Sequence, residues 1–168
     1  FIPYIEQLKL TNLTFAAPDV GSTNRVREVA SYFNAEMVIC DKHRKRANEI
    51  ASMVVIGDVT DRDIVLIDDI CDTGGTLAKA AGLLKEKGAR SVRALITHPV
   101  LSGKAYENIE NSVLEELVVC DTIPLKQESR KIKVVSVADL FAIAIRNAYE
   151  NKSITSLFIH SQLRGRDK

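Results

Sequence analysis

One strand–turn–helix segment constrains the fold of this chain more than any other. Its four apolar residues 64–67 (Ile-Val-Leu-Ile) are typical of a short strand that is buried on both faces. Two adjacent carboxylates, Asp68 and Asp69, stand at the carboxyl end of this strand. A turn of small residues, 72–76, follows and opens a helix that we expect to begin near Leu77.

The composition of the turn points to phosphate. Gly74 and Gly75 let backbone N–H groups converge on an anion, Thr73 and Thr76 add hydroxyl donors, and the start of the helix adds partial positive charge. A Thr-Gly-Gly-Thr run alone could be only a tight turn, and the segment is neither a Walker loop nor Gly-x-Gly-x-x-Gly. Two acids directly before an anion site suit a ligand that also carries sugar hydroxyls, or a Mg²⁺ ion held partly by water. The sequence therefore predicts a sugar-phosphate site.

Strand-like and helix-like segments alternate along the whole chain. We expect strands over residues 13–17, 36–40, 53–56, 64–67, 92–97, 117–120 and 134–137, with an edge strand at 156–159. We expect helices over residues 2–8, 22–33 (capped by Ser22), 77–87 (closed by Gly88), 103–111 and 138–150. This alternation predicts an α/β fold, with a mostly parallel sheet flanked by helices on both faces, in a single domain spanning residues 1–168.

Polar residues follow several of the predicted strands. Ligands of such sheets bind at the carboxyl ends of the strands, near the point where the strand order reverses. We therefore expect a common rim formed by Asp19, Asp41–Lys42, Asp68–Asp69 and Thr97–His98. His98 has no second histidine or cysteine at ligand spacing, which favours a structural role over a metal site.

Composition excludes several other classes of function. The net charge is +1, aromatic residues are 5% of the chain and Trp is absent, so we expect no nucleic-acid partner. No apolar run approaches the roughly 20 residues that span a bilayer, so we expect no membrane partner. The three cysteines are widely spaced and form no CxxC, which suits a reducing cytoplasm. For Cys71, beside the turn, a small filler residue is favoured over a low-pKa thiol.

Residues 41–48 (Asp-Lys-His-Arg-Lys-Arg-Ala-Asn) form a second informative segment. It directly follows a predicted strand, carries five basic residues and lacks periodic apolar positions. It is therefore either a solvated basic loop or a cationic loop that closes over polyphosphate. In the second case Lys42 and Arg44 would stabilise the charge on a phosphoryl group during its transfer.

Three segments resemble one enzyme family, in the family's order. Residues 41–48 have the form Asp-Lys-x-Arg-x-x-x-Asn, which resembles the catalytic flexible loop of ribose-phosphate diphosphokinases, also called phosphoribosyl-pyrophosphate synthetases. Residues 68–76 (Asp-Asp-x-x-Asp-Thr-Gly-Gly-Thr) resemble the ribose 5-phosphate loop that these enzymes share with phosphoribosyltransferases. Residues 97–105 resemble a further signature of the diphosphokinases. The match implies a phosphoribosyltransferase-like fold.

The resemblance implies transfer of the diphosphate of ATP to the C1 hydroxyl of ribose 5-phosphate, with Mg²⁺ as cofactor, giving phosphoribosyl pyrophosphate and AMP. Lys42 and Arg44 match the catalytic residues, and Arg44 also contacts the substrate. Asp68 matches the acid that binds the ribose hydroxyls. Asp19 matches a Mg²⁺ ligand, and Asp69 is a further candidate for the metal. The cradle of the 5-phosphate is matched by Asp72, Thr73, Gly74, Gly75 and Thr76.

The resemblance covers only the carboxyl-terminal half of the family's enzymes. The amino-terminal half, which holds most of the ATP site, does not precede Phe1. We therefore expect this chain to bind ribose 5-phosphate but to have negligible turnover alone, and the resemblance implies homo-oligomers, commonly hexamers. Ser22 stands where the family usually has glycine. Two alternatives stay open: a phosphoribosyltransferase, for which we find no base-binding segment, and a non-catalytic regulatory homologue.

Two further interpretations concern residues outside these motifs. Arg25 and Arg27, on the helix expected after Ser22, are typical of solvated charges, although Arg25 is close to the Asp19 segment. The apolar stripe Leu140, Phe141, Ala144, Ile145 and Ala148 is expected to belong to the core, with part of it at a subunit interface.

Overall fold

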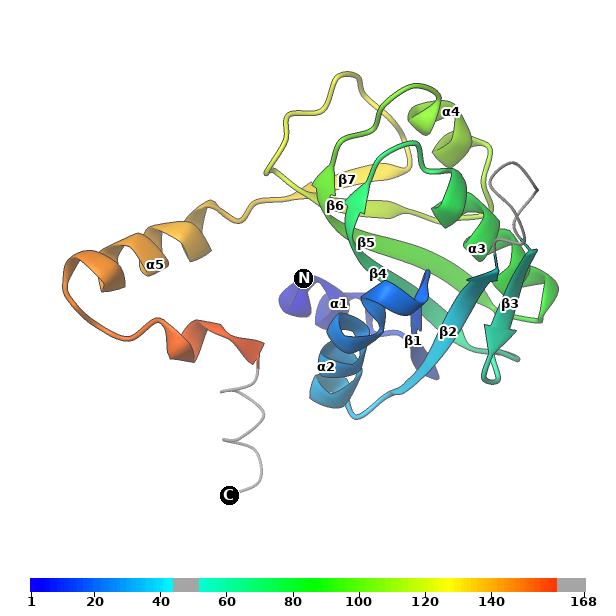
Figure 1. The fold of residues 1–168 in the computed structure, drawn as a ribbon, viewed down its shortest axis with the longest axis horizontal. Helices are drawn as coiled ribbons and strands as arrows, with labels where there is room; N and C mark the ends of the chain where they lie inside the picture. The colour runs from blue at the N-terminus through cyan, green and yellow to red at the C-terminus, as the bar shows by residue number, and fades with distance from the viewer. Residues whose placement is uncertain (44–51, 160–168) are drawn as a thin grey trace.

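The fold is an α/β arrangement, seen in a computed structural model that describes residues 1–43 and 52–159 (Figure 1). The strands are β1 (Leu13–Ala17), β2 (Glu36–His43), β3 (Ser52–Ile56), β4 (Asp63–Cys71), β5 (Ser91–Pro99), β6 (Leu117–Cys120) and β7 (Ile132–Val135). The helices are α1 (Ile2–Leu8), α2 (Thr23–Phe33), α3 (Gly75–Glu86), α4 (Ala105–Glu110) and α5 (Ala138–Tyr149), with short 3₁₀ turns η1 (Val20–Ser22) and η2 (Thr155–Leu157).

The strands form one sheet in the order β3-β2-β1-β4-β5-β6-β7. Neighbouring strands run parallel, except that β3 pairs with β2 in the antiparallel sense. Helices cover both faces, as predicted. Alternate residues of β4 show why: Ile64 and Leu66 pack in one core cluster with residues of α3 and α4, whereas Val65 and Ile67 pack in another with residues of α1 and α2.

The strand order reverses between β1 and β4. From β1 the chain moves outward to β2 and the edge strand β3, then returns to place β4 on the other side of β1 (Figure 1). The carboxyl ends of β1 and β4 are therefore neighbours at a topological switch point, where connecting segments diverge and leave room for a ligand.

Two strands continue beyond their apolar residues. β4 extends through Cys71, so Asp68 and Asp69 lie within the strand, and its pairing with β5 continues to Cys71. Residues 41–43 likewise belong to β2 and pair with β3, whereas the sequence predicted a loop from residue 41 onward. The prediction failed there because backbone pairing with a neighbouring strand does not require apolar residues.

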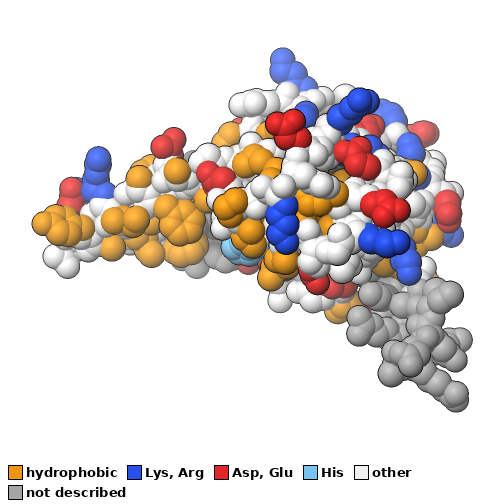
Figure 2. All heavy atoms as spheres, turned by 90° about the horizontal axis from the view of Figure 1, so that it is seen from above, with side chains coloured by type: hydrophobic (Ala, Val, Ile, Leu, Met, Phe, Trp, Pro, Cys, Tyr) orange, Lys and Arg blue, Asp and Glu red, His pale blue; other side chains and the backbone are white. Residues whose placement is uncertain are grey.

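The carboxyl-terminal segment differs most from prediction. None of the residues of α5, all of which the structure describes, is buried, so the expectation that its apolar stripe lies in the core is wrong. Phe141 is 58% exposed and Ile145 is 66% exposed. The helix projects from the body, and apolar side chains gather along it (Figures 1 and 2). Residues 156–159 form no edge strand; part of this stretch is the turn η2.

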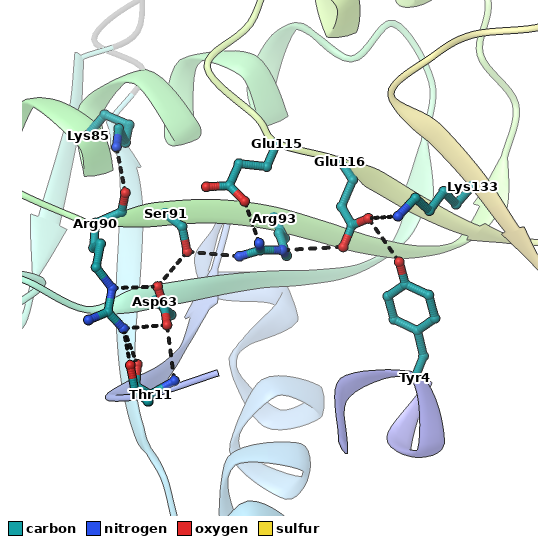
Figure 3. A network of polar contacts seen from close by, with 10 residues as sticks. All are labelled: Tyr4, Thr11, Asp63, Lys85, Arg90, Ser91, Arg93, Glu115, Glu116 and Lys133. Carbon is teal, nitrogen blue, oxygen red and sulfur yellow. Dashed lines mark hydrogen bonds and ion pairs between the residues drawn. The ribbon is translucent and has the colours of Figure 1, made fainter. Parts of the chain in front are cut away.

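A polar network ties the amino ends of the strands, at the edge opposite the switch-point rim (Figure 3). Asp63, the first residue of β4, is 6% exposed. It accepts hydrogen bonds from Arg90 Nε at 3.0 Å, Ser91 Oγ at 2.7 Å and the Thr11 backbone N–H at 3.1 Å. The hydrogen bond from Arg90 is the main cause that keeps the pKa of Asp63 below its usual value. These hydrogen bonds connect the amino ends of β1, β4 and β5.

A second buried acid belongs to the same network. Glu116, 6% exposed, contacts Arg93 and Lys133 and accepts a hydrogen bond of 2.9 Å from the Tyr4 hydroxyl (Figure 3). Tyr4 thereby attaches α1 to the sheet. Within residues 1–43 and 52–159, none of the helices has both the length and the apolar character that crossing a bilayer would require.

Candidate functional site

A cleft of about 220 Å³ lies at the switch point, on the carboxyl edge of the sheet. Its walls come from the segment after β1, the end of β4, the turn that follows and the start of α3. Six residues that the sequence nominated line it together: Asp19, Asp68, Asp72, Thr73, Gly74 and Thr76. The apolar part of the lining includes Ile70, Leu77 and Ile96.

The helix after the turn begins earlier than predicted. α3 starts at Gly75 rather than near Leu77, so Gly75 and Thr76 form its first turn. The N–H groups of a first helical turn have no acceptor inside the helix, and the helix dipole adds positive potential there. The turn therefore places the start of a helix at the cleft, an arrangement that can bind an anion; phosphate binding by residues 72–76 stays a prediction.

The two glycines of the turn have different reasons to lack a side chain. Gly74 has φ +70°, and a Cβ on it would lie 3.3 Å from Ile109 Cδ1 and 3.4 Å from the Ala105 carbonyl oxygen. At Gly75 a Cβ would meet only Thr73 Oγ1 at 3.7 Å, which is ordinary contact. The fold itself requires glycine at 74. At 75 the fold would accept a side chain, so the protein's own packing does not require glycine there.

Arg25 of α2 joins the two acids of β4. Its Nη1 lies 3.1 Å from Asp68 Oδ1, and its Nη2 lies 2.8 Å from Asp69 Oδ2. The sequence interpretation of Arg25 as a solvated charge is therefore wrong. The sequence did carry one indication that Arg25 lies near the acids. It stands six residues after Asp19, in the first turn of the helix that follows the Asp19 segment.

The two acids differ in how readily they ionise. Burial raises the pKa of Asp68 to about 6, and the negative charges of Asp19 and Asp69 act in the same direction. Burial also acts to raise the pKa of Asp69, but the charge of Arg25 and hydrogen bonds outweigh it, so this pKa is lowered. Asp68 lines the cleft, and its contact with Arg25 does not offset the cost of burying its negative charge. A hydroxyl donor or a cation in the cleft would therefore stabilise the ionised carboxylate.

Asp19 begins the η1 turn. Its Oδ1 accepts a hydrogen bond of 3.0 Å from the Ser22 backbone N–H, and Ser22 Oγ donates at 2.9 Å to the Asp19 carbonyl oxygen. The predicted capping of the helix by the Ser22 side chain is therefore wrong, because this hydroxyl is used within the turn. Ser22 is 1% exposed, so the serine fits the loop as a buried, satisfied group.

The donor set fits a partly hydrated Mg²⁺ ion. Among the residues that the structure describes, no group of three or more His, Cys, Asp or Glu could hold a metal by itself. Mg²⁺ in phosphate-transferring sites usually has one or two carboxylate ligands and completes its shell with water and phosphate oxygens. Asp19 and Asp68 both line the cleft and supply that number of carboxylates.

The cationic segment is described only in part. Lys42 lies in β2, where its backbone pairs with Met53, so it stands at the carboxyl end of the strand beside β1. This places its backbone on the rim that the sequence predicted. Arg44 lies outside the described residues. The catalytic roles of both residues stay predictions.

Cys71 and His98 have structural surroundings. Cys71 lines the cleft, but burial raises the pKa of its thiol to about 11, which supports the filler interpretation over a reactive thiol. His98 Nδ1 lies 3.0 Å from Thr122 Oγ1, which links the ends of β5 and β6. Two residues that contact the turn from behind, Ser102 and Asn108, were not singled out from the sequence; Ser102 falls within the signature at 97–105.

Comparison with known proteins identifies the family of the chain. Residues 21–159 match the model of the phosphoribosyl synthetase-associated domain. Ribose-phosphate pyrophosphokinases from Campylobacter jejuni and Wolinella succinogenes are each 53% identical over 159 residues, which cover 95% of this chain and 52% of each relative. The chain thus spans about half the length of the curated relatives it matches.

Solved structures give the same picture. Phosphoribosylpyrophosphate synthetase from Mycobacterium smegmatis superposes with a TM-score of 0.80 at 31% identity, over 89% of this chain and 49% of that one. A purine phosphoribosyltransferase from Pyrococcus horikoshii shares the fold, with a TM-score of 0.51 at 15% identity over 80% of each chain. The family model covers most of the chain, and the chain therefore belongs to the family of the phosphoribosyl synthetase-associated domain.

Proposed function

We propose that this chain is the ribose 5-phosphate-binding, carboxyl-terminal half of a ribose-phosphate diphosphokinase. The parent enzyme would transfer the diphosphate of ATP to the C1 hydroxyl of ribose 5-phosphate, giving phosphoribosyl pyrophosphate and AMP. One observation carries the proposal: a single cleft brings the anion-binding start of α3 together with the carboxylates of Asp19 and Asp68. A sugar phosphate would use both, its phosphate at the helix start and its hydroxyls at a carboxylate.

The phosphate and the hydroxyl groups of the ligand would contact different parts of the cleft. The terminal phosphate would accept hydrogen bonds from the amides and hydroxyls of residues 72–76, at the positive end of α3. The sugar hydroxyls would donate to the carboxylate of Asp68, whose raised pKa reflects burial that hydroxyl donors would offset. Gly75 leaves room for the phosphate to approach the backbone.

The diphosphate transfer needs positive charge on the opposite side of the sugar. Asp19, with Asp68 or Asp69, would hold Mg²⁺, which when bound would neutralise charge on the diphosphate. Lys42 and Arg44 would contribute further positive charge to the transferring group, and Arg44 would also contact the substrate. Most of the ATP site would come from the other half of the parent enzyme, and this chain alone is expected to release negligible AMP. A homo-oligomer in the cytoplasm is part of the same proposal.

Two alternatives make different predictions. A phosphoribosyltransferase would use the same turn for phosphoribosyl pyrophosphate, and the fold likeness to the Pyrococcus horikoshii enzyme favours keeping this candidate. A non-catalytic homologue would keep the fold without turnover. Binding of ribose 5-phosphate to this chain, compared with phosphoribosyl pyrophosphate and with ribose, distinguishes a sugar-phosphate site from a site selective for the pyrophosphorylated sugar.

The decisive experiment uses the full-length parent enzyme with ATP, Mg²⁺ and ribose 5-phosphate, and measures AMP release. A Lys42→Ala change should lower kcat by about 10²–10³, because such donors act mainly in the transition state. Lys87→Ala, at the far end of α3, is the matched control and should leave kcat unchanged. Equal rates for the two variants would reject the diphosphokinase role of Lys42 and favour the non-catalytic alternative.

A further inference from the structure

The phosphate turn is attached from behind to the segment that joins β5 to α4. The backbone N–H groups of Leu101 and Ser102 donate to the carbonyl oxygens of Cys71 and Asp72, each at 3.0 Å. Ser102 Oγ donates a further hydrogen bond to Asp72 Oδ1. Residues 71 and 72 are thus held by the segment before α4, and the next two residues, Thr73 and Gly74, contact α4 itself.

Thr73 and Gly74 are held by α4. Asn108 Nδ2 donates to the Thr73 carbonyl oxygen at 2.8 Å, across 35 residues of sequence. Gly74 packs so closely on α4 that a Cβ there would lie 3.3 Å from Ile109 Cδ1. α4 itself is anchored in the core, since Ala105 and Ile109 are fully buried. The contacts of Asn108 and Ser102 therefore connect the turn to a rigid part of the molecule.

These contacts also orient the amides of the turn. In a planar trans peptide the C=O and the following N–H point in opposite directions. The hydrogen bond from the Ser102 backbone N–H to the Asp72 carbonyl therefore turns the N–H of Thr73 away from the supporting segment. The Ser102 side chain adds a second contact, to the Asp72 carboxylate, and this contact is the one that an alanine at 102 removes. The hydrogen bond from Asn108 to the Thr73 carbonyl turns the N–H of Gly74 away from α4 in the same way. Asp72, Thr73 and Gly74, whose backbone these contacts hold, all line the cleft.

We infer that Ser102 and Asn108 are positioning residues for the phosphate turn: they touch no ligand, and they set the turn so that an anion does not have to order it. The inference rests on the proposed function and names how its phosphate site is formed. A turn with two adjacent glycines loses much conformational entropy when it becomes ordered. Ordering it during folding, through two side chains, removes that cost from ligand binding.

The test compares Ser102→Ala and Asn108→Ala with two controls in the 168-residue chain. Asn111→Ala makes the same chemical change at an exposed position, the residue that directly follows α4. Ser102→Thr keeps the hydroxyl and should restore what Ser102→Ala loses. Two quantities are measured in each variant. The first is turn exchange, the hydrogen exchange of the amides of residues 78, 101 and 102, which donate to carbonyl oxygens of residues 71–74, compared with exchange at 64–67. The second is the dissociation constant for ribose 5-phosphate by calorimetry.

Each alanine variant should speed turn exchange by about three- to tenfold and weaken ribose 5-phosphate binding by a similar factor, the range expected for one lost hydrogen bond. Exchange at 64–67 should stay unchanged. The inference is overturned if turn exchange does not rise, if exchange at 64–67 rises equally because the whole fold is destabilised, or if Ser102→Thr behaves like Ser102→Ala.

The same data separate this inference from the proposed function. If the unsubstituted chain binds ribose 5-phosphate and both alanine variants bind equally well, the positioning role is wrong and the proposed function stands. If turn exchange rises selectively but the unsubstituted chain binds no ribose 5-phosphate, the positioning of the turn is supported and the proposed function is wrong.

Discussion

Arg25 Nη2 lies 2.8 Å from Asp69 Oδ2, so a cation of α2 already neutralises the second acid of β4. The same guanidinium reaches Asp68 through its other nitrogen. These contacts connect α2 to β4 near the carboxyl edge of the sheet. They also limit the negative charge near a site for which we propose a phosphate ligand.

The ion pair yields a first prediction. Arg25→Ala should weaken binding of ribose 5-phosphate by about two- to fivefold, because the acids lose a partly exposed counter-charge and repel the phosphate more strongly. Arg27→Ala, on an exposed position of the same helix, is the matched control and should bind like the unsubstituted chain. Calorimetric titration measures both, and equal affinities for the two variants would contradict the account.

The two glycines of the turn should respond differently to alanine. Gly74→Ala forces a side chain to φ +70° against Ile109, which should lower the free energy of unfolding by about 1–2 kcal/mol. Gly75→Ala lies in the first turn of α3 and should leave the free energy of unfolding equal or raise it by up to about 1 kcal/mol. It should nevertheless abolish measurable ribose 5-phosphate binding. Denaturant unfolding and calorimetry measure the two effects; normal binding by a stable Gly75→Ala variant would show that position 75 does not face the ligand.

Asp63 makes stability depend on pH at the opposite end of the strands. Its pKa is lowered in the fold, chiefly by the hydrogen bond from Arg90, so its contribution is present above its unfolded pKa of about 4 and is lost as pH falls through the lower folded value. Asp63→Asn should reduce the free energy of unfolding by about 2 kcal/mol at pH 7 and by less at pH 3. Asp139→Asn, in exposed α5, should change neither. A deficit for Asp63→Asn that is as large at pH 3 as at pH 7 would rule out this linkage.

The projecting helix allows a prediction about truncation. None of the described residues of α5 is buried, whereas the Asp121 carboxylate holds Ser136 and the backbone of Val137. A chain ending after Val137 should therefore keep the melting temperature of the remaining body within about 2 °C, since surface changes usually cost little. Differential scanning calorimetry measures this, and a large drop would mean that α5 packs on the body in solution.

Local features of the sequence predicted the central part of the fold. The buried run at 64–67, the acids after it and the small-residue turn led to a parallel α/β sheet with a phosphate site at its rim, and the structure places six of the nominated residues around one cleft. The prediction of the sheet was correct because a strand, a turn and a helix start are each determined by a few neighbouring residues, whereas the phosphate site stays a prediction.

The misses share a different physical origin. The Arg25 contacts span more than 40 residues of sequence and the Asn108 contact spans 35, and spacing along the chain carries no information about such pairs. The stripe of α5 has helical periodicity, but periodicity shows only that a face is apolar and not what covers it. The extension of β4 through Cys71 depends on pairing with β5 rather than on its own residues.

The central claim is that the turn at 72–76 grips the phosphate of a pentose while Asp68 holds its hydroxyls. Heteronuclear NMR titration of the chain with ribose 5-phosphate tests it most directly, with unphosphorylated ribose as the control. We expect saturable shifts of the backbone amides of residues 73–76 and of Asp68, and at most small shifts with ribose. Unchanged signals at 73–76, in a sample whose other resonances show an intact fold, would contradict the account.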